Sequence, residues 1–176
     1  MDEGFFQYQG ALNHDAIEAA RSISLFFKVH DAELAFQPGW PHVSKVRGDV
    51  FIEDSGVRIK AREGRLLDTQ VRNVKVDIPH AEAGKNSHLH LDGEFAGGLE
   101  DGLKILQDAP IGTASTFAGW QGEGDLQGRV KLDIPLGKGE EPKIQVDLQT
   151  DKARLKLAEP ALELTQLTGD FRCDSA

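Results

Sequence analysis

The stretch "VKVDIP", from Val74 to Pro79, returns almost unchanged as "VKLDIP" from Val130 to Pro135. In both copies apolar and charged residues alternate, and this period of two is the pattern of a β-strand with one buried face and one solvated face. The proline closes each copy, because a residue without an N–H group interrupts strand pairing. The chain is therefore expected to repeat one amphipathic strand within a larger sheet.

A longer echo indicates that more than one strand is repeated. The segment "AELAFQPGWPHVSKVRGDV" (32–50) is matched by "ARLKLAEPALELTQLTGDF" (153–171) at a constant shift of 121 positions. Self-similarity at a fixed period is typical of stacked supersecondary units. We therefore expect residues 1–176 to be a single β-rich segment of a longer repetitive protein, in which 153–171 begins a second repeat of 32–50. The identical positions are Ala32, Leu34, Gly48 and Asp49, matched by Ala153, Leu155, Gly169 and Asp170.

The same alternation predicts further strands along the chain, and Phe51 is the one residue that breaks it in "KVRGDVFIE" (45–53). Turn-forming residues separate these strands, which is typical of an antiparallel meander. Clean alternation argues against a parallel sheet covered on both sides, whose strands read as continuous apolar runs. The predicted turns lie at 53–56, 62–64, 82–87, 137–142 and 158–160.

Two segments depart from the strand pattern. "GGLEDGLKILQDAP" carries Leu99, Leu103 and Leu106 at helical spacing and stops before a proline, which predicts a short amphipathic helix over about 98–107. A weaker helical pattern covers 13–22. The first helix is expected to cover one end of the sheet.

About ten strands with one apolar face each, and so little helix, leave much apolar surface to be covered. Two folded-over sheets would bury it as a sandwich, whereas a curled sheet would leave a groove. The predicted fold is thus mainly β: a curled antiparallel β-meander, forming a groove or an open sandwich-like sheet, with one or two short helices.

The composition excludes several classes of partner and framework. A net charge of −9, from 29 acidic and 20 basic residues that are interspersed, is unsuited to nucleic acid, which needs a concentrated basic surface. No run approaches the roughly 18 apolar residues of a membrane span, so none is expected here. A lone cysteine, Cys173, cannot form an intramolecular disulfide.

No catalytic, metal or cofactor signature emerges from the sequence. His88 and His90 lie two apart on a strand, with His80 nearby, and such a pair could hold zinc or copper if a third ligand converged. The acidic residues Asp92 and Glu94 continue the same face, so a solvated polar face is the preferred interpretation. The glycine-rich "GWQGEGDLQG" lacks the Lys-Ser/Thr ending of a phosphate loop. We expect neither an enzyme nor a cofactor-binding protein.

The segment from Phe26 to Pro79 resembles the YhdP-type AsmA-like family. The resemblance rests on an aromatic-led strand, a second strand ending in an aromatic before "PGWP", a "GDV" strand and a later "GRVKLDIPL" strand. It extends over about 23–171. The motifs are those of a scaffold rather than of a catalytic site. They are Phe27 to Val29, Leu34 to Phe36, Pro38 to Pro41, Gly48 to Val50 and Gly128 to Leu136.

The resemblance implies a bridge-like lipid transfer protein of the bacterial envelope. Such proteins are anchored in the inner membrane, extend through the periplasm, and carry phospholipid toward the outer membrane along a hydrophobic β-groove. This sequence would then be an internal segment whose partners are phospholipid acyl chains and neighbouring β-repeats, with an edge-strand dimer possible. The alternative is a structural periplasmic β-scaffold with a closed core and no lipid path. The expected groove lining is Val46, Val50, Ile52, Val74, Val76, Ile78, Leu89, Leu91, Val130, Leu132, Ile134, Ile144, Val146 and Leu148.

Overall fold

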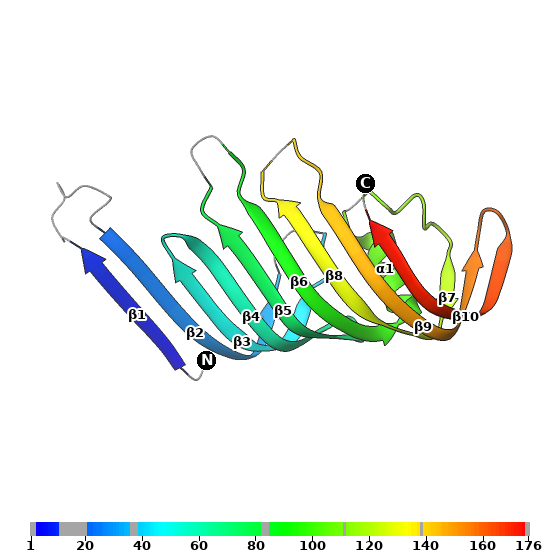
Figure 1. The fold of residues 1–176 in the computed structure, drawn as a ribbon, viewed down its shortest axis with the longest axis horizontal. Helices are drawn as coiled ribbons and strands as arrows, with labels where there is room; N and C mark the ends of the chain where they lie inside the picture. Colours follow the sequence, from blue (N-terminus) through cyan, green and yellow to red (C-terminus); the bar gives the residue numbers. More distant parts are fainter. Residues whose placement is uncertain are drawn as a thin grey trace.

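The computed structural model describes residues 3–10, 21–35, 39–81, 85–110, 112–137 and 139–174. These residues form one large sheet and one short helix (Figure 1). In chain order the elements are β1 (Glu3–Gly10), β2 (Arg21–Leu34), β3 (Val43–Glu53), β4 (Gly56–Leu66), β5 (Thr69–Pro79), β6 (His88–Gly98), α1 (Leu99–Asp108), β7 (Gln121–Glu123), β8 (Asp125–Pro135), β9 (Lys143–Leu157) and β10 (Leu162–Asp174).

The sheet is an antiparallel meander of ten strands. Its order is β1-β2-β3-β4-β5-β6-β8-β9-β10, and the short β7 pairs with the far part of β9. Among the described residues β1 and β10 each pair on one side only, so the sheet is open rather than closed into a barrel. The predicted fold class, a mainly β antiparallel meander, is confirmed.

The strands bend, and Figure 1 shows the sheet curving around the side on which α1 lies. The bends coincide with β-bulges, because register shifts interrupt the pairing of β2 with β3, β3 with β4, β5 with β6 and β9 with β10. A bulge adds one residue to one strand and increases its local twist and bend. Non-glycine residues with φ between 51° and 57° mark these places: Asp31, Lys45, Asn73, Lys152 and Gln166.

Neighbouring strands approach closely at several glycines, of which Gly48 and Gly128 are examples. A Cβ atom on Gly48 would lie 2.4 Å from the carbonyl oxygen of Lys60 in β4, and one on Gly128 would lie 2.2 Å from the carbonyl oxygen of Asp147 in β9. No side chain fits at such distances, so both positions require glycine.

The helix α1 packs on the apolar face at one end of the sheet. It begins and ends one residue later than the predicted range 98–107. Leu103 is buried, and the carboxylate of Asp101 accepts hydrogen bonds of 2.9 Å from the backbone N–H of Asp68 and the hydroxyl of Thr69. The helix is thus fixed to the β4–β5 turn.

The weaker predicted helix over 13–22 lies outside the described residues, except for its last two positions. Arg21 and Ser22 belong to β2, so at these two positions the structure contradicts the helical prediction. They pair with β1, and that cross-strand pairing extends the strand to this point.

One predicted turn is wrong. Residues 62–64 lie inside β4, and the chain reverses at Leu67 and Asp68 instead. Gly64 is buried, and a Cβ there would meet side chains of Val43, Val46 and Val71, so this glycine serves close packing rather than a turn. The other predicted turns coincide with strand connections wherever their residues are described.

Candidate functional site

A row of apolar residues crosses the sheet from β2 to β9. Its members are direct partners on successive strands, and alternation places them all on one face. Six steps between neighbouring strands at about 4.8 Å give the row a length of about 29 Å. We call this row the apolar lane; it consists of Phe27, Val50, Ile59, Val76, Leu91, Leu132 and Ile144.

Further apolar rows flank the lane on the same face. On one side Leu25, Ile52, Val57 and Ile78 are successive partners, and Leu89 pairs with Ile134. On the other side the register aligns Val130, Val146 and Cys173 with Gly93. The lane therefore runs along the middle of a broad apolar face.

The structure places the fourteen residues expected to line a groove on the apolar face, with differing exposure. Val46, Leu89 and Ile134 are buried, at 1%, 7% and 5% relative exposure. The remaining eleven of the fourteen are partly exposed. Five of the fourteen fall in the lane itself. The other two lane residues, Phe27 and Ile59, were missed, although Ile59 alternates with Arg58 and Lys60 and so carried the same signal.

Among the residues that the structure describes, no second sheet covers the apolar face. The helix α1 packs at one end of this face, near β6, β7 and Leu126, and its Asp101 accepts hydrogen bonds from Asp68 and Thr69 at the β4–β5 turn. A broad face of partly exposed aliphatic side chains is unusual for a monomer and is typical of an interaction surface or a ligand groove.

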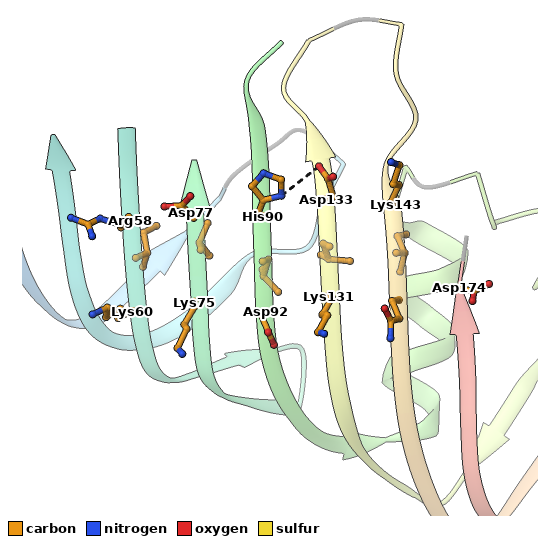
Figure 2. Close-up of a pocket in the computed structure, with 16 residues that line it drawn as sticks. Arg58, Lys60, Lys75, Asp77, His90, Asp92, Lys131, Asp133, Lys143 and Asp174 are labelled. Atoms are coloured by element: carbon orange, nitrogen blue, oxygen red, sulfur yellow. Dashed lines mark ion pairs between the residues drawn. The ribbon is translucent and has the colours of Figure 1, made fainter. Parts of the chain in front are cut away.

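The opposite face is charged. Figure 2 shows charged side chains in two rows that cross neighbouring strands, and the strand register places one row on each side of the lane. Residues of both rows and five lane residues contribute atoms to a hollow of about 730 Å³ in this part of the sheet. The upper row is Arg58, Asp77, His90, Asp133 and Lys143, and the lower row is Lys60, Lys75, Asp92, Lys131 and Asp174.

Ion pairs between strands hold many of these charges. Arg129 donates from Nε and Nη2 to the two carboxylate oxygens of Asp92, at 2.6 and 2.7 Å. These hydrogen bonds keep the pKa of Asp92 below its ordinary value. A hydrogen bond from Arg172 likewise lowers the pKa of Asp147. The two faces of the sheet are thus chemically distinct, one apolar and one charged.

The histidines expected on the polar face, His88 and His90, do lie there, and both lie near acidic residues. The Nδ1 atom of His88 is 2.6 Å from Asp133 and its Nε2 atom is 3.2 Å from Glu140, while His90 is 3.7 Å from Asp133. The hydrogen bond with Asp133 raises the pKa of His88. The described part of the chain contains no group of three or more His, Cys, Asp or Glu residues that could hold a metal ion.

None of the helices in the described segments is long and apolar enough to cross a membrane.

The sequence also matches a known protein family. A family model described as "YhdP protein" matches residues 1–176. No curated protein matches, and no solved structure matches.

Proposed function

The chain belongs to the YhdP family, and from that premise we propose that it is a segment of an envelope lipid-transfer protein. In this proposal the apolar face is part of a hydrophobic β-groove that carries phospholipid between the inner and outer membranes. The proposal includes no catalytic role and no cofactor.

The continuity of the apolar lane carries this proposal. An acyl chain needs a long apolar wall and no specific hydrogen bonds, and each methylene that leaves water contributes about 0.8 kcal/mol. The lane offers such a wall across seven strands, with partly exposed residues from Val50 to Ile144. Charged residues lie on the opposite face, where they would keep the outside of the groove solvated.

The direction of the lane suggests the partners. Because the lane crosses the strands, it would be lengthened by further strands added beyond β1 and β10. We propose neighbouring β-repeats of a longer chain as these partners, in a protein that is anchored to the inner membrane and extends through the periplasm. The same edges could pair two copies into a dimer when no repeat occupies them.

A closed β-scaffold is the second candidate. It is favoured by the burial of Val46, Leu89 and Ile134, which shows that part of the face is already packed against protein. In that case the partly exposed residues would be covered by protein partners and no lipid would enter.

Lipid extraction from the purified protein tests the proposal. Phospholipid should be found by mass spectrometry with the wild-type chain and should be lost in the Val76→Glu, Leu132→Glu variant. The matched control is Lys75→Glu, Lys131→Glu, which changes neighbouring positions on the opposite face and should retain lipid. Loss of lipid from both variants, or its absence from the wild type, would favour the scaffold.

A photo-crosslinker at single positions provides a test that needs no buried charge. A benzophenone amino acid at Leu91 should give a lipid adduct in cells, whereas the same group at Asp92 should not, because strand alternation turns it to the charged face. Lipid adducts at neither position, or equally at both, would contradict a groove on this face.

A further inference from the structure

His88 connects three parts of the chain at the end of the sheet where β6 begins. It is the first residue of β6, Asp133 lies near the end of β8, and Glu140 belongs to the β8–β9 connection. The imidazole lies between the two carboxylates, with Nδ1 2.6 Å from Asp133 Oδ1 and Nε2 3.2 Å from Glu140 Oε2.

This geometry depends on the charge of the ring. A carboxylate accepts hydrogen bonds and cannot donate them, and a neutral imidazole has a single N–H. Only the imidazolium ion can therefore donate to both carboxylates at once. Loss of its proton leaves one carboxylate facing a nitrogen lone pair.

Other hydrogen bonds bring two connections into this cluster. The second oxygen of Glu140 accepts a 2.8 Å hydrogen bond from the side-chain amide of Asn86, in the β5–β6 connection. The backbone N–H of Leu136 donates to the carbonyl oxygen of Ser87 at 2.8 Å. The cluster thus joins the β5–β6 and β8–β9 connections along one end of the sheet.

We propose that protonated His88 fastens the β8–β9 connection to β6, and that loss of this proton releases Glu140 and loosens this end of the sheet. The proposal describes a pH-sensitive contact between the β8–β9 connection and β6. It goes beyond the proposed lipid path and does not depend on it.

The charged surroundings favour the imidazolium form. Asp133 comes from β8 and Glu140 from the connection, and both are negative. His90, on the same strand, is stacked on His88 with ring centroids 6.0 Å apart and has Asp77 of β5 as its partner across the strands. Lys143 of β9 is opposite Asp133, and its positive charge acts against the imidazolium form; His90 shares Asp133 with His88, at 3.7 Å.

The direction of the pH effect follows from these contacts. The hydrogen bond with Asp133, with a smaller effect from Glu140, raises the pKa of His88 above its ordinary value of about 6.5. The folded state thus binds this proton more tightly than the unfolded state. The stabilisation is fully present below the ordinary value and is lost as the pH rises through the raised pKa.

Hydrogen exchange of the intact chain tests the proposal. The backbone amides of Leu136, which donates to Ser87, and of Lys143, the first residue of β9, should lose protection by about tenfold between pH 6 and pH 8.5, after correction for intrinsic exchange. In the His88→Gln variant the protection should be low at both pH values. The matched control is His42→Gln, which removes an exposed histidine with a single acidic partner, Glu33, at 3.1 Å.

A second measurement distinguishes an effect of the His88 proton from a purely structural effect of the His88 side chain. In the Glu140→Gln variant the NMR titration midpoint of His88 should fall, because one carboxylate partner has been neutralised. An unchanged midpoint, or a His88→Gln variant with the wild-type pH dependence of exchange, would overturn the proposal. Either result can be obtained whether or not the chain carries lipid.

Discussion

The β2–β3 and β9–β10 hairpins share one backbone plan. Adding 121 to each partner of β2 and β3 gives a pair in β9 and β10. Thus the pair Ala32 with Val46 becomes Ala153 with Leu167. The residues with φ near 55° also correspond, since Asp31 and Lys45 become Lys152 and Gln166. These facts support our proposal that 153–171 begins a second repeat of 32–50.

The hairpins differ in what covers them. The close contact between Gly48 and β4 has no counterpart at Gly169, where a Cβ would meet nothing within 4 Å. Val46 is buried, whereas its counterpart Leu167 is partly exposed. The comparison teaches that local sequence can set bulges and register, while burial depends on which strand comes next.

The largest expected difference in stability between the two hairpins is at the equivalent glycines, Gly48 and Gly169. Gly48→Ala should destabilise the fold by about 3 kcal/mol, because the new methyl group overlaps the backbone of β4. Gly169→Ala should cost about 1 kcal/mol, from backbone strain at φ 149° alone. Urea unfolding measures both values. Equal losses would mean that contact with β4 is not what distinguishes the two sites.

At the equivalent alanines, Ala32 and Ala153, we expect the larger loss of stability in the β9–β10 hairpin, which is the reverse of the glycine sites. Ala153 is fully buried against the backbone of Gly124, whereas Ala32 is partly exposed. Ala153→Val should therefore cost about 2 kcal/mol and Ala32→Val less than about 1 kcal/mol. Thermal unfolding followed by circular dichroism would show the difference. A greater loss at Ala32 would contradict the interpretation that Ala153 is buried by its contact with Gly124.

Much of the fold could be predicted because each strand carries its own alternation of apolar and charged residues. The bulges could not, since Lys45 and Gln166 are not residue types that favour positive φ. The turn predicted at 62–64 failed because a glycine in a strand can serve packing as well as reversal. Phe51, which broke the alternation, packs on the charged face against Phe26.

The apolar character of the candidate site could be predicted from the sequence. Whether other protein covers the site could not. Alternation put Val76 and Leu132 on one face, but whether a second layer covers them depends on contacts between distant segments. For the same reason His88 was interpreted as part of a solvated face. Its partner Glu140 lies in a distant connection, and only the sheet order brings the two residues together.

The smallest expected effects concern the equivalent pairs on the charged face. Phe26 and Phe51 lie with ring centroids 5.0 Å apart, and their counterparts Asp147 and Arg172 form an ion pair. Double-mutant cycles should give a coupling of about 1 kcal/mol for the phenylalanines that is insensitive to salt. The exposed ion pair should couple more weakly and lose that coupling at high salt.

The coupling energies of the two pairs should also differ in their dependence on pH. Because Arg172 lowers the pKa of Asp147 in the folded state, the stability from this pair is present above the ordinary carboxyl pKa and is lost as the pH falls through the lowered value. The aromatic coupling has no titrating group and should persist. A salt-sensitive aromatic coupling would show that Arg58 and Lys60, both 5.9 Å from the Phe51 ring, contribute most of it. Electrostatic interactions would then stabilise both hairpins, although the residues at the equivalent positions differ.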